Sequence, residues 1–127
     1  MTRDIEQPWG AQFRHSAGEL TTRFLRAARD ERLLGWRSGG RVLVPPRDTG
    51  LAGEWVDVGP RATLLAASSR TLDDGSRVAL VAIDGAHGCC WWRVRGNALR
   101  PGSRIHARFA SERRDSPVDV WFEPEGA

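Results

Sequence analysis

The chain has 127 residues, of which 40% are hydrophobic and 28% charged, and its formal net charge is +3. This length fits one domain rather than two full ones, and six Trp with four Phe exclude a disordered or fibrous chain. The apolar runs are far shorter than the roughly 20 residues of a membrane helix, and the start lacks the apolar core of a signal peptide. We therefore expect a cytoplasmic protein.

The first part of the chain predicts an arm and one helix. Residues 1–15 show no apolar period, so they predict an irregular arm that uses Trp9 and Phe13 as anchors. The motif Ser16-Ala17-Gly18-Glu19 matches a capping box, which places the start of a helix there and its end near Glu31. The apolar face of this helix is predicted to consist of Leu20, Phe24 and Ala27 or Ala28.

From Arg32 onward the pattern predicts only β structure. Short apolar runs alternate with turn signals such as Ser38-Gly39-Gly40 and Asp73-Asp74-Gly75. The expected strands cover residues 33–37, 41–44, 54–58, 62–69, 78–83, 89–95, 105–110 and 118–122. Five or six strands at this spacing favour a small closed or partly closed antiparallel barrel.

Side-chain alternation divides the last three strands into an inner and an outer set. The inner set is predicted to be Cys90, Trp92, Val94, Ile105, Ala107, Phe109, Val118, Val120 and Phe122. Asp119 is predicted to point outward together with seven residues that we call the Trp/Arg face: Trp91, Arg93, Arg95, Arg104, His106, Arg108 and Trp121. A surface that is both aromatic and cationic binds phosphates, bases or an acidic partner. Alternatively, these are ordinary solvent-facing arginines, with the two Trp covered by the N-terminal arm.

Signals for catalysis or metal binding are weak. The three His are scattered, and no hydrolase, metalloprotease, P-loop or dinucleotide motif is present, so we do not expect an independent enzyme. Cys89 and Cys90 point to opposite faces of one strand and cannot chelate a metal together, with or without His87. A plain buried Cys90 is the simpler prediction.

The stretch from Trp36 to Trp55 resembles a known family. It keeps Gly40, the triplet Pro45-Pro46-Arg47 and a Trp-containing strand at the spacing found in the domain of unknown function thirty-five family. Segments 59–63, 78–85 and 99–109 resemble barrel segments of that family in the right order, so the resemblance spans about residues 18–124. The family's four zinc-binding cysteines would fall at Trp36, Gly39, Gly50 and Gly53, and none of these residues can ligate zinc.

The resemblance implies a mainly β fold in three parts. These are an N-terminal arm and helix over residues 1–32, a degenerate, zinc-free ribbon over 33–57 and a five-stranded OB-fold barrel over 58–127. Because a loop that loses its metal must be held by packing instead, Trp36 is a candidate replacement for the zinc.

The resemblance also implies a function. Family members are non-catalytic partners of thiolase-superfamily acyl-CoA enzymes, of thiolase, acyltransferase or steroid side-chain aldolase type. This chain would then be an accessory subunit of a hetero-oligomer in lipid or steroid metabolism, giving docking surface and stability. It would bind no cofactor alone and would share acyl-CoA with its partner, with the Trp/Arg face as the candidate contact.

Two further functions are kept open from the residues. An OB-fold that binds single-stranded nucleic acid would stack bases on Trp91 and Trp121 and follow phosphates with its arginines. The nearly balanced acidic and basic residues argue against this alternative. A small enzyme or ligand-binding protein that uses the barrel mouth is the third, although no residue stands out as its nucleophile.

Overall fold

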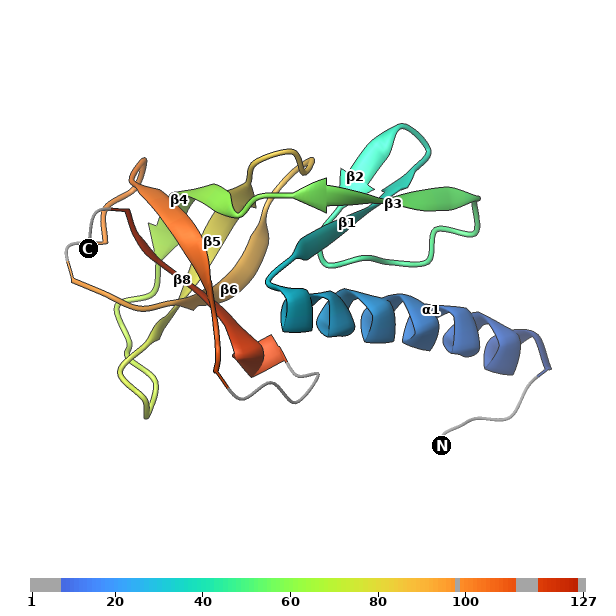
Figure 1. Cartoon of the computed structure of the whole chain (residues 1–127), viewed down its shortest axis with the longest axis horizontal. Coiled ribbons are helices and arrows are strands. Elements are labelled where there is room, and N and C mark those ends of the chain that lie inside the picture. Colours follow the sequence, from blue (N-terminus) through green and yellow to red (C-terminus); the bar gives the residue numbers. More distant parts are fainter. Residues whose placement is uncertain (1–7, 98, 112–116, 126–127) are drawn as a thin grey trace.

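The computed structural model describes residues 8–97, 99–111 and 117–125, and shows a mainly β protein with one N-terminal α-helix (Figure 1). Short apolar runs between Gly- and Pro-containing turns form strands, as predicted. The elements in chain order are α1 (Pro8–Ala27), η1 (Ala28–Asp30), β1 (Leu33–Ser38), β2 (Arg41–Leu43), β3 (Gly53–Val58), β4 (Arg61–Ala67), β5 (Arg77–Ile83), β6 (Cys90–Val94), β7 (Arg104–Phe109), η2 (Pro117–Asp119) and β8 (Val120–Pro124).

The first three strands form a small antiparallel sheet in the order β2-β1-β3. The β1–β2 hairpin turns at Gly39 and Gly40, whose φ angles of 60° and 78° favour glycine. Across the sheet, Trp36 of β1 lies opposite Leu43 on one side and Trp55 on the other. The helix α1 runs beneath this sheet and extends away from the barrel (Figure 1).

The last five strands form a closed barrel in the order β4-β5-β6-β8-β7, with β7 returning to β4, which confirms the predicted small barrel. All neighbouring strands are antiparallel except β6 and β8, which pair in parallel at Val94 and Phe122. A register shift between Leu64 and Ala66 marks a bulge in β4, a feature that lets a strand bend around a small barrel. The barrel is OB-fold-like.

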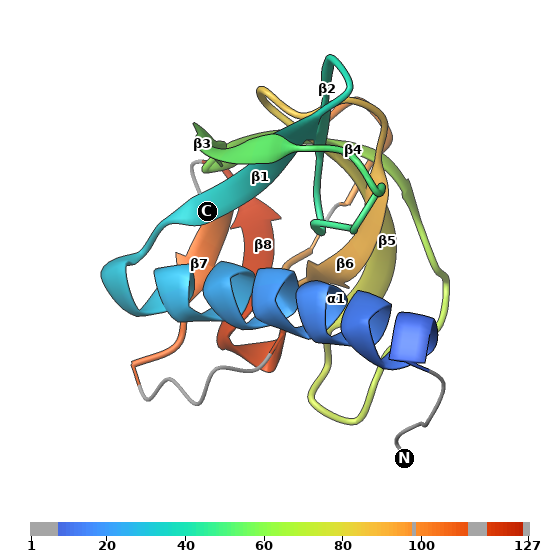
Figure 2. The same ribbon diagram turned by 90° about the vertical axis from the view of Figure 1, so that its right-hand side faces the viewer.

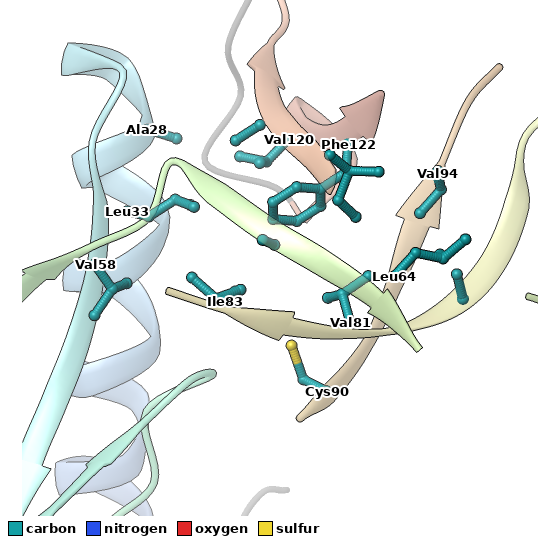
Figure 3. Close-up of a cluster of buried hydrophobic side chains, with 14 of the residues drawn as sticks. Ala28, Leu33, Val58, Leu64, Val81, Ile83, Cys90, Val94, Val120 and Phe122 are labelled. Atoms are coloured by element: carbon teal, nitrogen blue, oxygen red, sulfur yellow. The ribbon is translucent and has the colours of Figure 1, made fainter. Parts of the chain in front are cut away.

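The barrel interior contains Cys90, Val94, Ile105, Ala107, Val120 and Phe122 of the predicted inner set, with Trp92 and Phe109 partly buried against it (Figure 3). The strands β4 and β5, for which no inner set was predicted, add Leu64 and Val81. Leu64, Val81, Val94 and Ile105 are fully buried, and the ring of Phe122 is 1% exposed. This core continues into the sheet through Leu33, Val42 and Val58, which belong to the same cluster. Sheet and barrel therefore share apolar contacts.

The helix packs at the junction of sheet and barrel (Figure 2). Phe24 and Ala27 are buried against Leu34, as the predicted apolar face requires, and Leu20 is half-buried. The ring of Phe24 meets Trp92 of β6 edge-on, with ring centroids 6.0 Å apart. Trp92 in turn donates from Nε1 to the carbonyl oxygen of Val120 at 2.8 Å.

Two local predictions were wrong. The helix begins at Pro8 rather than Ser16, so residues 8–15 are helical instead of part of an irregular arm, and the capping-box motif lies inside the helix. Pro is well tolerated in a first helical turn, and a capping-box sequence does not mark a helix start when the helix continues upstream of it. Residues 1–7 and the side chains of residues 8–17, including the predicted anchors Trp9 and Phe13, lie outside the described part of the chain.

Asp119 is the second correction, because it is 2% exposed instead of pointing outward. The turn η2 interrupts the period-two alternation just before β8, and the Asp119 carbonyl accepts a hydrogen bond from Ala110 N–H at 2.8 Å. The side chain of Val118 lies outside the described part.

No helix within the described residues is long and apolar enough to cross a membrane.

Candidate binding face of the barrel

The three strands that carry the Trp/Arg face are neighbours, as its prediction required. β8 lies between β6 and β7, so Trp121 stands opposite Arg108, and His106 opposite Glu123. Arg93, Arg95, Arg104, His106 and Trp121 are half-buried, whereas Trp91 and Arg108 are exposed. The fold therefore brings the predicted residues to one side of the barrel.

A carboxylate that the sequence reasoning did not include organises the β6 part of this face. Asp74 Oδ2 accepts from Arg93 Nη1 at 2.9 Å and from Arg95 Nη2 at 3.3 Å. Asp74 Oδ1 accepts from the backbone N–H of Ser76 at 2.9 Å and lies 2.5 Å from its hydroxyl oxygen. These two Ser76 hydrogen bonds, assisted by the two guanidiniums, lower the pKa of Asp74 to about 2.

Arg95 also stacks on an aromatic ring. Its Cζ lies 4.2 Å from the Trp121 ring centroid, the geometry of a cation–π contact. Its Nε is buried and has no hydrogen-bond partner within the described residues. The guanidinium is thus held between Trp121 and Asp74, which limits its freedom to reach a ligand.

The β7 part of the face is paired in the same way. Arg104 forms a bidentate ion pair with Asp84, with Nη1–Oδ1 and Nη2–Oδ2 distances of 3.0 Å and 2.5 Å. Its Nη1 also donates to Thr63 Oγ1 at 2.9 Å. Hydrogen bonding from Arg104 lowers the pKa of Asp84. Glu123 accepts from Trp121 Nε1 at 2.8 Å and from Arg108 Nε at 3.3 Å, and these two donors, Trp121 first, lower the pKa of Glu123.

The carboxylates on this side of the barrel were not among the predicted site residues. Glu123 has the outward parity of Trp121 on β8, and Glu125, directly after the strand, keeps this parity, so extending the alternation beyond the predicted end at residue 122 would have found both. Glu125 pairs with Arg61 of β4 through two contacts of 2.5 and 2.8 Å. Asp74 and Asp84 lie in turns, and only the closed topology brings them beside β6 and β7.

Trp91 differs from the rest of the face because it is 61% exposed. Val94 and Phe122 pair in parallel, so Arg93 of β6 lies level with Trp121 of β8. Trp91 therefore lies two residues, or about 7 Å, away from Trp121 along the strand direction. It lines a mainly apolar groove of about 260 Å³ with Val78, Trp92, Arg93 and Pro117. The Trp/Arg face therefore consists of an ion-paired region and, at one end, an exposed indole beside a groove.

The four positions that the resemblance assigns to zinc ligands lie in the sheet and its loop. The indole of Trp36 contacts Trp55 edge-on, with centroids 5.0 Å apart, and a Cβ added to Gly53 would lie 2.6 Å from Trp36 Cε2. A Cβ on Gly39 would meet Leu51 at 3.2 Å, while a Cβ on Gly50 would meet nothing within 4 Å. These residues do not fit a zinc ion, because none offers a donor atom and an indole fills the space beside Gly53.

Cys90, the first residue of β6, is buried, as predicted, and Cys89, directly before the strand, is exposed. Burial raises the pKa of the Cys90 thiol to about 11. Across the described ranges, no group of three or more His, Cys, Asp or Glu side chains is placed to hold a metal ion.

Comparisons with known proteins do not assign the chain to a class: no family model, no curated protein and no solved structure matches it.

Proposed function

We propose that this chain is a non-catalytic OB-fold subunit of a thiolase-superfamily acyl-CoA enzyme. The observation that carries the proposal is the arrangement of the four positions where the domain of unknown function thirty-five family has cysteines. Gly53 pairs with Ser38 next to the turn at Gly39, and it packs against the Trp36 ring. Three of the four positions, Trp36, Gly39 and Gly53, thus lie close together. Their closeness supports a ribbon that has lost its zinc and in which packing of the Trp36 indole replaces the metal.

The barrel adds support for an accessory role. Its strand order is compatible with an OB-fold, and Trp91 offers an exposed indole beside an apolar groove. Large aromatic side chains of this kind are frequent anchors of protein interfaces. In the proposal, this groove docks on the partner enzyme, which holds the nucleophile and the acid–base groups, while acyl-CoA is shared between the chains.

Single-stranded nucleic acid is the weaker alternative. Affinity for nucleic acid comes largely from guanidinium and ammonium groups that neutralise phosphates. Arg93, Arg95, Arg104 and Arg108 each have a carboxylate partner already. A phosphate backbone would have to displace these partners, so we expect no oligonucleotide binding that persists at physiological salt.

Affinity capture from the native host tests the proposal. The tagged chain is recovered under mild conditions, and the bound proteins are identified and quantified by mass spectrometry. A thiolase-superfamily enzyme in near-stoichiometric amount supports the accessory role. Recovery of the chain alone, or with nucleic acid, contradicts it.

A matched pair of variants tests where the partner docks. Trp91 and Leu51 are both 61% exposed, but Leu51 lies in the loop that precedes β3. Trp91→Ala should weaken capture of the enzyme at least tenfold, as for an interface anchor, whereas Leu51→Ala should leave it unchanged. Equal capture by both variants would remove the groove from the proposal.

Restoring the cysteines tests the ribbon. A chain with Trp36→Cys, Gly39→Cys, Gly50→Cys and Gly53→Cys should bind Co²⁺ with the absorption of a tetrahedral thiolate site. Placing Cys at Gly39 and Gly50, where φ is positive, should cost about 1–3 kcal/mol of backbone strain at each position. The binding free energy of a structural zinc site, about 10–16 kcal/mol, is large enough to offset this strain. The same chain with Gly53 retained is the control, and absence of tetrahedral binding in the fourfold variant would argue against a ribbon.

A further inference from the structure

A polar pocket of about 410 Å³ lies where the β1–β2 sheet meets the loop between β5 and β6. The sheet side contributes Arg41 and the loop residues Arg47 and Thr49, and the barrel side contributes His87 and Cys89. The pocket is not part of the Trp/Arg face, because none of that face's residues lines it. Its volume falls within the range of small-molecule sites.

The walls of the pocket are held in place by hydrogen bonds. His87 N–H donates to the Val42 carbonyl at 2.9 Å, and Val42 N–H donates to His87 Nδ1 at 2.9 Å, which ties the β5–β6 loop to β2 (Figure 2). On the opposite wall, the hydroxyls of Ser38 and Thr49 lie 2.6 Å apart, and Asp48 Oδ1 accepts from Gly50 N–H at 2.8 Å. The pocket is therefore largely preformed.

The bond from Val42 also defines the tautomer of His87. Because Nδ1 acts as an acceptor, the neutral ring must carry its proton on Nε2. The imidazole that lines the pocket thus has an N–H donor in its Nε2 position.

The charge of the pocket differs from that of the Trp/Arg face. Arg41 and Arg47 are exposed, and neither forms an ion pair with any carboxylate in residues 8–97, 99–111 and 117–125. Asp48 is the one carboxylate among the lining residues, and its Oδ1 is already engaged by Gly50. Two guanidiniums against one carboxylate leave the pocket positive.

We propose that this pocket binds the phosphate group of a phosphorylated small molecule. A guanidinium has a planar fork that matches the spacing of phosphate oxygens, and the pocket lining supplies two such groups together with the imidazole of His87. The volume is larger than a phosphate ion alone requires, so the remainder of the molecule also has space. This inference does not rest on the proposed function, since it uses other residues and no partner enzyme.

Cys89 provides an internal reporter for the test. Its exposed thiol lines the pocket, whereas Cys90 is buried, so a neutral reagent such as iodoacetamide should alkylate Cys89 first. With a dissociation constant of about 1 mM, about 10 mM phenyl phosphate should slow this alkylation roughly tenfold. Amide chemical shifts of the non-proline residues in 41–50 and of residues 86–89 should move in parallel, which gives a readout independent of the thiol.

Variants and salt controls decide the outcome. Arg41→Gln with Arg47→Gln should abolish both the protection and the shift changes, while Arg70→Gln with Arg100→Gln, which change exposed arginines outside the pocket, should retain them. Because Arg41 and Arg47 are exposed, the fold should survive, which the amide spectrum checks. Protection below twofold, equal protection by sodium chloride at the same ionic strength, or full protection in the Arg41/Arg47 variant would overturn the proposal.

Discussion

The barrel and the three-stranded sheet are stabilised in different ways. Each barrel strand has a partner on both sides, and the barrel interior contains side chains that are entirely buried. The sheet has two edges, β2 and β3; it buries Leu33, Val42 and Val58 in the core that it shares with the barrel, and adds the Trp36–Trp55 contact and the bond between the hydroxyls of Ser38 and Thr49. Closure gives every barrel strand two neighbours around an interior of its own, whereas the open sheet buries its apolar residues only by packing on the barrel and the helix.

The arginines that line the pocket differ from the ion-paired arginines of both regions, because the sheet also pairs Arg32 with Asp57 and Arg37 with Glu54. On the barrel, arginines alternate with carboxylates from other strands and turns, so most of the positive charge is compensated locally. Arg41 and Arg47, beside the sheet, have no such partner within the described ranges. A cluster of basic residues in the sequence therefore does not indicate where the free positive charge of the folded chain lies.

Removing a central ring of the barrel should have the largest effect on stability. Phe122 is 1% exposed, and Phe122→Ala should lower the free energy of unfolding by about 3–5 kcal/mol because it leaves a cavity. Urea denaturation measures this change. Leu51→Ala, at an exposed position, should change it by less than about 0.5 kcal/mol. A loss below about 1 kcal/mol for Phe122→Ala would contradict a tightly packed barrel.

Removing the indole of Trp36 should have a smaller and more local effect. The side chain is only half-buried, so we expect Trp36→Ala to cost about 2–3 kcal/mol, below the range for a fully buried Trp. Amide hydrogen exchange should accelerate in β1–β3 more than in β4–β8. Uniform acceleration across both regions would show that the sheet does not depend on this local contact.

The hydrogen bonds from Ser76 to Asp74, assisted by the ion pairs with Arg93 and Arg95, should make the stability of the barrel sensitive to acid. The pKa of Asp74 is lowered in the folded state to about 2, so this carboxylate stabilises the fold above its unfolded pKa of about 4. That stability is lost as the pH falls from about 4 to about 2. The difference in melting temperature between the natural chain and Asp74→Asn should be constant above about pH 5 and shrink through this window. Asp73→Asn, in the same turn, should show a much smaller change.

The exposed ion pair of the sheet should contribute least. Arg37 and Glu54 lie on opposite strands, with Nη1 and Oε1 2.8 Å apart, and their side chains are 52% and 63% exposed. A double-mutant cycle with Arg37→Ala and Glu54→Ala should give a coupling free energy below about 0.5 kcal/mol, decreasing further with salt. A coupling above about 1 kcal/mol would mean that this pair, rather than the aromatic contact, stabilises the sheet.

Strand positions and inward residues were predictable from the sequence because alternation is a local property. Cys90, Val94, Ile105 and Phe122 were placed correctly in this way. The helix start was missed because Ser16 to Glu19 has the same appearance inside a helix as at its end. The pairing of Arg93 and Arg95 with Asp74, about twenty residues away, depends on barrel closure and on a turn geometry that no local pattern encodes.

The short connection between sheet and barrel limits how this chain can be divided. Only Gly59 and Pro60 separate β3 from β4, and Gly59 N–H donates to the Asp84 carbonyl at 2.8 Å. Leu33 and Val58 belong to the same apolar cluster as Ile83. A barrel cut free at this point would expose that apolar end to water, so we expect it to be less stable than the same barrel within the whole chain.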